Sequence, residues 1–129
     1  MATTNLVDLA IEVSKNAYVP YSHFPVSAVL VSLQQEIYTG VNIENASFGL
    51  TNCAERTAIF KAVSEGVRDF SELIIYGQTE KPISPCGACR QVMAEFFHKD
   101  LKVTLVAKDK STVEMTVGEL LPYSFTDLH

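Results

Sequence analysis

The fold of this chain is decided by two segments, Thr51-Asn52-Cys53-Ala54-Glu55-Arg56-Thr57-Ala58 and Ser84-Pro85-Cys86-Gly87-Ala88-Cys89-Arg90-Gln91, which contain all three of its cysteines. Three thiols supply three soft ligands, which suits a tetrahedral zinc ion whose fourth position is left to water, as in a catalytic site. Glu55 stands close after Cys53 and can carry the proton of that water. The sequence therefore predicts hydrolytic chemistry at a zinc ion held by Cys53, Cys86 and Cys89.

Both cysteine segments are predicted to begin helices. The first helix should run from Cys53 to Glu65, with Asn52 as its N-terminal cap and Gly66 as its stop. In the second, apolar residues recur at helical spacing: Cys89, Val92, Met93, Phe96 and Phe97. We expect the two helix starts to lie side by side at the carboxyl edge of a sheet, where α/β proteins place their sites.

The rest of the chain alternates helical and strand patterns. Residues 4–18 predict an amphipathic helix, and a capping box from Thr116 to Glu119 predicts a short helix that stops at Pro122. Strands are predicted over residues 26–33, 36–42, 73–77, 101–107 and 112–116. This order predicts an α/β fold, a three-layer sandwich in which a mixed sheet of about five strands carries helices on both faces.

Length, composition and charge limit the classes of function. A chain of 129 residues, 47% hydrophobic and 19% charged, predicts one domain over residues 1–129. Fifteen acidic residues against ten basic ones give a formal charge of −5, which disfavours a nucleic-acid partner. No stretch approaches the roughly 20 apolar residues of a membrane helix, so no membrane partner is expected. An odd number of cysteines and the absence of a signal-like start favour a cytoplasmic protein with reduced thiols.

The Cys53-Ala54-Glu55 and Pro85-Cys86-Gly87-Ala88-Cys89 boxes resemble those of the zinc-dependent cytidine deaminases of the small, homotetrameric type. The resemblance extends to Pro20–Val26, Asn42–Ser47 and Glu119–Pro122, and so covers nearly the full length. It implies a cytidine deaminase-like sandwich with one Zn²⁺ per subunit. It also implies a hydrolase of pyrimidine salvage, which converts cytidine and deoxycytidine to uridine and deoxyuridine with release of ammonia.

The resemblance also implies roles for individual residues. Attack of zinc-activated hydroxide at C4 of cytosine would be assisted by Glu55, which takes the water proton, protonates N3 and delivers a proton to the departing amine. Asn42 and Glu44 would bind the ribose hydroxyl groups, and the backbone near Ala54 would contact the pyrimidine ring. Phe24 would pack against the nucleoside.

The last implied role belongs to Phe125, which in the family closes over the base in a neighbour's active site. Two aromatic residues, Tyr123 and Phe125, follow the helix-stopping proline in a segment too short to build its own core. Docking on the parent domain is the alternative that burial preferences leave open. The resemblance favours a homotetramer with shared active sites, for which D₂ symmetry is the commonest closed arrangement.

Arg56 is predicted to neutralise the thiolates. Three thiolates and a zinc ion leave the site formally at −1, which weakens its ability to acidify water. A cation in the first turn of a helix is disfavoured by the helix dipole. Arg56 therefore needs a specific anionic partner, and the thiolates can accept its hydrogen bonds.

Three other interpretations account for part of the sequence. A deaminase of a cytosine-nucleoside antibiotic such as blasticidin S shares both boxes, but Arg56 and Phe125 favour the plain nucleoside enzyme. A binding module with structural zinc would need a fourth ligand from His23, His98 or His129, none of which has finger-like spacing. Redox chemistry at Cys86 and Cys89 leaves Glu55 without a role.

Two positions depart from the family pattern. Phe48 stands where tyrosine is frequent, which removes a hydroxyl that could touch the sugar or a neighbouring subunit. Ser27 stands where glycine is frequent, a small change that we expect the strand to absorb.

Overall fold

The computed structural model describes residues 3–126 and confirms the predicted order of elements. The chain forms α1 (Thr3–Val13), β1 (Val26–Ser32), β2 (Ile37–Val41), α2 (Ala54–Ser64), β3 (Phe70–Gly77), α3 (Gly87–Phe96), β4 (Lys102–Val106), β5 (Thr112–Thr116) and α4 (Val117–Leu120). Two 3₁₀ turns, η1 (Ser14–Asn16) and η2 (Phe48–Leu50), complete it. None of the helices in the described part has the length and apolar character that a membrane crossing needs.

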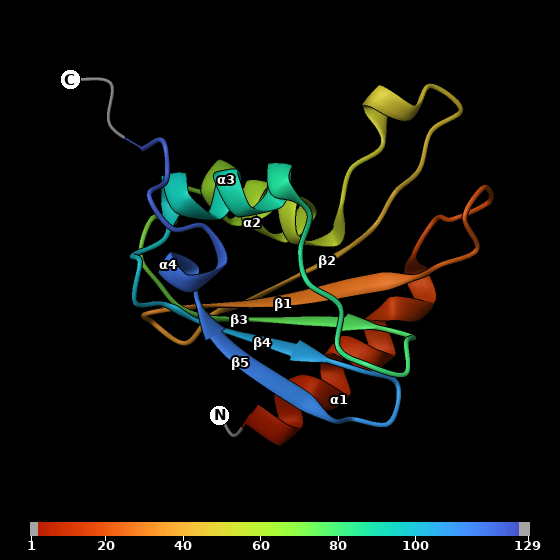
Figure 1. Cartoon of the computed structure of the whole chain (residues 1–129), viewed down its shortest axis with the longest axis horizontal. Helices are drawn as coiled ribbons and strands as arrows, with labels where there is room; N and C mark the ends of the chain where they lie inside the picture. Colours follow the sequence, from red (N-terminus) through yellow and green to blue (C-terminus); the bar gives the residue numbers. More distant parts are fainter. Residues whose placement is uncertain (1–2, 127–129) are drawn as a thin grey trace.

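The five strands form one mixed sheet, as predicted, and their order in it is β2-β1-β3-β4-β5. β3 and β4 pair in parallel, and the other neighbours are antiparallel. Because β2 and β3 both run antiparallel to β1, they point the same way and end at the same edge of the sheet. α2 follows β2 and α3 follows β3, so the topology brings the two helix starts to one corner of the molecule (Figure 1).

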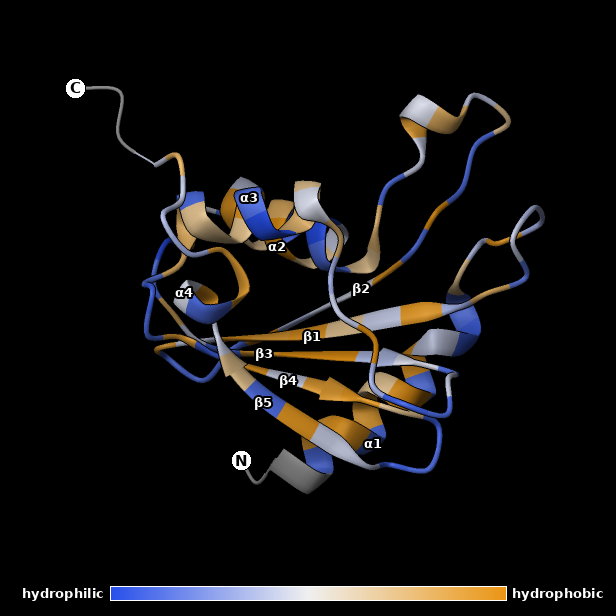
Figure 2. Cartoon of the chain, in the orientation of Figure 1, coloured by the Kyte–Doolittle hydropathy of each residue, from blue (hydrophilic) through white to orange (hydrophobic). Residues whose placement is uncertain are grey.

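Helices cover both faces of the sheet, which confirms the three-layer sandwich. α1 lies on one face, and α2, α3 and α4 lie on the other (Figure 1). Alternate strand residues point to opposite faces, and the central strands are apolar along most of their length (Figure 2). On the α1 face, the buried core consists of Leu6, Val7, Ala10, Val29, Val31, Ile74, Tyr76 and Val106. The core of the other face includes Ala28, Leu30, Ala58, Ile59, Leu73, Ile75, Cys89, Met93, Val103 and Leu105.

Two small residues fix the distance of the helices from the sheet. A Cβ atom on Gly40 would overlap the backbone at Ala54 and Ala58, so α2 rests directly on the backbone of β2. Ser27 is fully buried in β1, and its hydroxyl donates to the carbonyl oxygen of Ala10 in α1. The serine that replaces the frequent glycine thus ties α1 to the sheet, because a buried hydroxyl needs a partner.

The structure corrects three boundaries. α1 ends at Val13 rather than at residue 18, and the Ser14 hydroxyl donates to the Ile11 carbonyl at 2.6 Å, a local bond that competes with the helix. Asn52 is not the cap of α2. It pairs with Ile43 in an isolated bridge, and Cys53 is the N-cap of the helix, which begins at Ala54. β3 begins at Phe70 rather than at residue 73.

Candidate active site

The three thiols converge at the starts of α2 and α3. Cys53 and Cys86 are the N-caps of the two helices, and Cys89 is buried in the first turn of α3. Their sulfur atoms all lie within 4.8 Å of one another, with Sγ–Sγ distances of 3.8 Å for Cys53–Cys86 and 3.3 Å for Cys86–Cys89. Sulfur ligands of a tetrahedral zinc ion lie about 3.8 Å apart, given Zn–S bonds of about 2.3 Å. The three thiols therefore fit zinc in number, type and spacing.

Histidine does not join this cluster within residues 3–126, where the only such group of possible metal ligands consists of the three cysteines. His23 is exposed in the loop before β1, with a left-handed backbone at φ 56°. His129 lies outside the described residues. Among residues 3–126, therefore, no histidine completes a closed structural zinc site. The fourth position that is left open suits a catalytic site.

Arg56 contacts the cluster as predicted. Its Nη2 donates to Cys53 Sγ at 3.4 Å, while its buried Nε has no partner among the described residues. Hydrogen bonds to the sulfur, from Cys89 and then from Arg56, lower the pKa of Cys53 to about 5. Bonding to Cys53 and burial raise the pKa of Cys89. Cys53 is thus more readily ionised than Cys89, and Arg56 lies beside the Cys53 thiolate.

Glu55 is a buried carboxyl group beside the thiols. Only 4% of its surface is exposed, and burial raises its pKa from the ordinary value. It lines a cavity of about 180 Å³ together with Val26, Asn42, Thr51, Cys53, Ala54, Ile83, Ser84, Pro85 and Cys86. A carboxyl group whose pKa moves toward neutrality can both accept and return a proton, which is the property of a general acid-base catalyst.

Asn42 and Glu44 both hold the loop before β1. Asn42 Oδ1 accepts the Val26 amide at 3.0 Å, and its Nδ2 donates to the Phe24 carbonyl at 2.8 Å. Glu44 Oε1 accepts the amides of Tyr21 and Ser22 at 3.0 and 3.1 Å, and its Oε2 accepts the Ser22 hydroxyl. The hydrogen bond from Ser22 lowers the pKa of Glu44, which keeps this half-buried carboxylate charged.

Glu44 lies in a second concavity, of about 380 Å³, which is lined by Tyr21, Ser22, Glu44, Phe48 and Thr51. Thr51 lines both concavities, so the two adjoin. Cys53, Cys86 and Glu55 line the smaller concavity, and Glu44 lines the larger one. Together the two concavities form a site with an acid-base end at Glu55 and a hydrogen-bonding end at Glu44. Ser22 and Thr51 were not predicted as site residues.

Residues 2–105 match the family described as cytidine and deoxycytidylate deaminase zinc-binding region. A cytidine deaminase from Halalkalibacterium halodurans is 53% identical over 121 residues, which are 94% of this chain and 92% of that protein. This chain belongs to the cytidine deaminase family. A cytidine deaminase from Sporosarcina psychrophila is 54% identical over 112 residues, covering 87% of this chain and 82% of that one. The crystal structure of cytidine deaminase from Burkholderia pseudomallei superposes with a TM-score of 0.94 at 43% identity, covering 97% of this chain and 100% of that chain.

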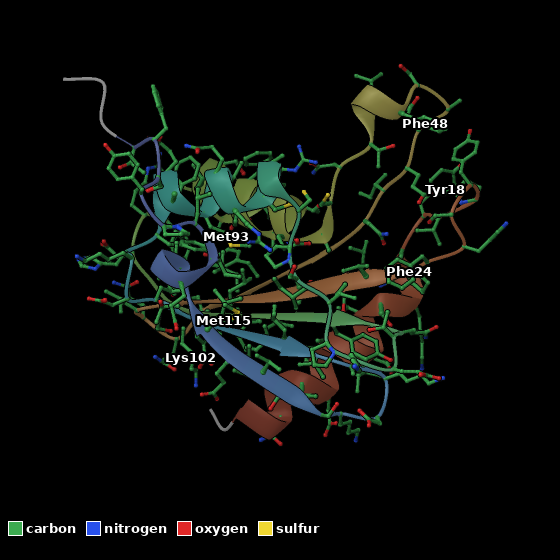
Figure 3. The ribbon with its side chains drawn as sticks, viewed as in Figure 1. Tyr18, Phe24, Phe48, Met93, Lys102 and Met115 are labelled. Atoms are coloured by element: carbon green, nitrogen blue, oxygen red, sulfur yellow. The ribbon has the colours of Figure 1, made fainter. Side chains whose placement is uncertain are left out.

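Two aromatic residues predicted from the cytidine deaminase resemblance lie outside the cavity wall. Phe24 is half-buried and packs against the core of the α2–α3 face, at the base of the loop that ends in β1 (Figure 3). Phe125 is 61% exposed, and its carbonyl accepts Gln91 Nε2 at 2.7 Å. The chain after α4 passes beside α3 toward the end away from Gly87 (Figure 1). Phe125 therefore does not line the cavity of its own chain.

Proposed function

We propose that this protein deaminates cytidine and deoxycytidine by hydrolysis, giving uridine and deoxyuridine with release of ammonia. The observation that carries the proposal is the burial of Glu55 in the wall of a cavity that Cys53 and Cys86, two members of the cluster of three thiols, also line. Membership of a family of zinc-dependent deaminases supports the same reaction.

Each group at the acid-base end has a task in this reaction. Cys53, Cys86 and Cys89 would hold the zinc ion, which when bound supplies an acidified water. Glu55 accepts a proton of the attacking water and passes it to N3 of the cytosine ring. It then delivers the second proton to the amino group, so the C4–N bond breaks and the oxygen stays on C4. Burial raises the pKa of Glu55, which favours its protonated form as the donor in the second transfer.

Arg56 would balance the charge of the thiolates through its bond to Cys53. Removing positive charge from a cluster of three thiolates would leave the sulfurs too electron-rich to acidify water well. The buried Nε of Arg56 points to a further acceptor in the assembled site.

The substrate is proposed to be a nucleoside rather than a nucleotide. None of the residues that line the two concavities is lysine or arginine, and Glu44 carries a negative charge. A 5′-phosphate would meet no cation there. Asn42 and Glu44 are suited to the hydroxyl groups of a sugar, because an amide can both donate and accept hydrogen bonds and a carboxylate accepts them. Ala54 lies buried in the wall of the base cavity.

The test is an ultraviolet assay. Adding cytidine or deoxycytidine to zinc-replete protein should lower the absorbance of the cytosine ring, with ammonia formed in equal amount, while cytidine 5′-phosphate should react far more slowly. Equal rates with the nucleotide would contradict the nucleoside assignment. No ammonia from either nucleoside would contradict the proposed function.

We further propose that the protein is a cytoplasmic homotetramer with shared active sites. Large apolar side chains are exposed on two loops that project beyond the sheet, and Phe48 is 79% exposed (Figure 3). Its ring meets Tyr21 edge-to-face, with centroids 6.5 Å apart. Exposed apolar patches of this kind are typical of subunit interfaces. The three free thiols support a reducing compartment.

Mixing of subunits tests the sharing of sites. Glu55→Ala protein keeps Phe125, and Phe125→Ala protein keeps Glu55. After mild dissociation and reassembly of a mixture, some sites would combine a normal Glu55 with a normal Phe125 from different chains. Turnover should rise above that of both parents. If native mass spectrometry confirms exchange and activity stays at the parental average, Phe125 acts within its own chain or not at all.

A further inference from the structure

The carboxylate of Glu44 has almost all of its acceptor capacity in use. Oε1 accepts two backbone amides, from Tyr21 and Ser22, and Oε2 accepts the Ser22 hydroxyl. A carboxylate offers about four lone-pair positions. One position therefore remains, and it is on Oε2, the oxygen that the Ser22 hydroxyl holds.

The Ser22 hydroxyl has little freedom to point elsewhere. Its oxygen accepts the amide of Phe24 at 3.1 Å, so its single hydrogen is left for Glu44 Oε2. The carboxylate is thereby held at both oxygens, and rotation of its plane would break at least one bond. Held in this way, Oε2 presents its remaining lone pair from the wall of the concavity that adjoins the Glu55 cavity through Thr51.

We propose that Ser22 is a positioning residue that aims the uncommitted acceptor position of Glu44 at a sugar hydroxyl of the substrate. The inference rests on the proposed function and deepens it, because it assigns to Ser22 a share in the recognition of the ribose. Ser22 itself would not touch the sugar, since its hydrogen is committed to Glu44.

The competing explanation is that Ser22 only stabilises the loop. The two roles can be separated, because other hydrogen bonds hold the loop when the Ser22 hydroxyl is removed. The backbone amides of Tyr21 and Ser22 still bind Glu44 when the hydroxyl is removed. Asn42 also still bonds to Phe24 and Val26 at the other end of the loop. Ser22→Ala therefore removes the constraint on Oε2 and leaves most of the fastening of the loop in place.

Steady-state kinetics with two nucleosides provide the test. For cytidine, Ser22→Ala should raise KM about three- to tenfold, the size of one hydrogen bond, with kcat little changed. For 2′,3′-dideoxycytidine, which lacks the hydroxyls that Glu44 would bind, the same variant should have the wild-type KM. Ser22→Thr, which keeps a hydroxyl, should restore most of the affinity for cytidine.

The chain offers a matched control in Ser111, an exposed serine whose hydroxyl donates to Asp109 Oδ1 at 2.6 Å. Ser111→Ala removes a similar serine–carboxylate bond from the turn between β4 and β5 and should leave both KM values unchanged. An equal rise in KM for the two nucleosides would show that Ser22 only shapes the loop and would overturn the proposal. So would an unchanged KM for cytidine.

A readout independent of turnover separates this inference from the proposed function. If Ser22 holds Oε2, the pKa of Glu44 measured by carboxyl carbon NMR should rise toward its ordinary value in Ser22→Ala and stay low in Ser22→Thr. An unchanged pKa in Ser22→Ala would overturn the positioning role. Wild-type turnover of cytidine reports on the proposed function alone, whatever the variants do.

Discussion

The two faces of the sheet are built by the same rule and used differently. On the α1 face, the buried side chains of the cluster around Leu6, Ala10 and Val29 are apolar, and their burial serves stability. On the α2–α3 face, the core also contains Cys89, and the carboxyl group of Glu55 is buried beside it. Burial of acidic groups lowers stability unless they are paired, so Cys89 and Glu55 carry a cost that the aliphatic side chains around Leu6 do not. The comparison indicates that chemistry is confined to one face and that the other stabilises the sheet that supports it.

The largest expected effect comes from neutralising the buried carboxyl group of the α2–α3 face. Glu55→Gln should lower turnover about 10²–10⁴-fold, because an amide can form hydrogen bonds but cannot accept the water proton. Zinc content and the unfolding transition should be retained. Turnover, metal analysis and thermal unfolding together check this.

A matched control is Glu12→Gln, which neutralises an exposed carboxylate of α1 that pairs with Lys15 at 3.0 Å, and it should change turnover little. Cys53→Ala, Cys86→Ala or Cys89→Ala should instead lose the zinc, since two thiolates hold the ion poorly. Glu55→Gln protein with full zinc and near-normal turnover would contradict the assignment of Glu55.

A substitution that creates a cavity on the α1 face should have the opposite effect, a loss of stability with no loss of turnover. Leu6 is fully buried there, and Leu6→Ala should lower the free energy of unfolding by about 2–5 kcal/mol. Turnover per folded molecule should stay at the wild-type value, because no residue of α1 lines the cavity of Glu55. Urea unfolding and active-site titration measure the two quantities.

Leu33, which is 58% exposed at the end of β1, supplies the control, and Leu33→Ala should cost far less stability. A fall in turnover per folded Leu6→Ala molecule, at unchanged zinc content, would show that the two faces are coupled and that the division between them is wrong.

The smallest effect concerns the charge balance at the thiols. Arg56→Gln removes the donor 3.4 Å from Cys53 and should lower kcat/KM about tenfold, the size of one charged hydrogen bond. Adding Cys53→His should recover part of the loss, because a neutral imidazole in place of a thiolate brings the formal charge from −1 to zero. If the double variant is no better than Arg56→Gln alone at equal zinc content, Arg56 has another task.

The sequence was most informative where function depends on local spacing. Cys86 and Cys89 lie within one helical turn, and the thiols were correctly expected to meet, because right-handed crossovers bring the two helix starts to one edge of the sheet. The capping box of Thr116 and Glu119 was also correct, since both of its bonds are local. Patterns within a few residues carry this information directly.

Contacts set by tertiary structure were missed. Asn52 is a residue type that often caps helices, but its pairing with Ile43 keeps its backbone extended, so the N-cap is Cys53 and the helix begins at Ala54. The bonds between Ser22 and Glu44 join residues 22 apart in sequence and exist only because two irregular loops meet. Loop conformations of this kind have no period from which they could be predicted. That residues 1–129 form a single domain, and the individual roles of the site residues, stay predictions.

The origin of the thiols in separate βα units has a thermodynamic consequence. Cys53 and Cys86 are 33 residues apart and belong to helices that β3 separates along the chain. A metal bound by both acts as a reversible cross-link of the folded chain, because the two thiols are brought together only when the βα units are folded. Its binding energy adds to the stability of the folded state in proportion to the logarithm of free zinc. The same ion that serves the chemistry thus offsets the cost of burying ionisable groups on its face, and the availability of zinc sets how firmly α2 and α3 are held together.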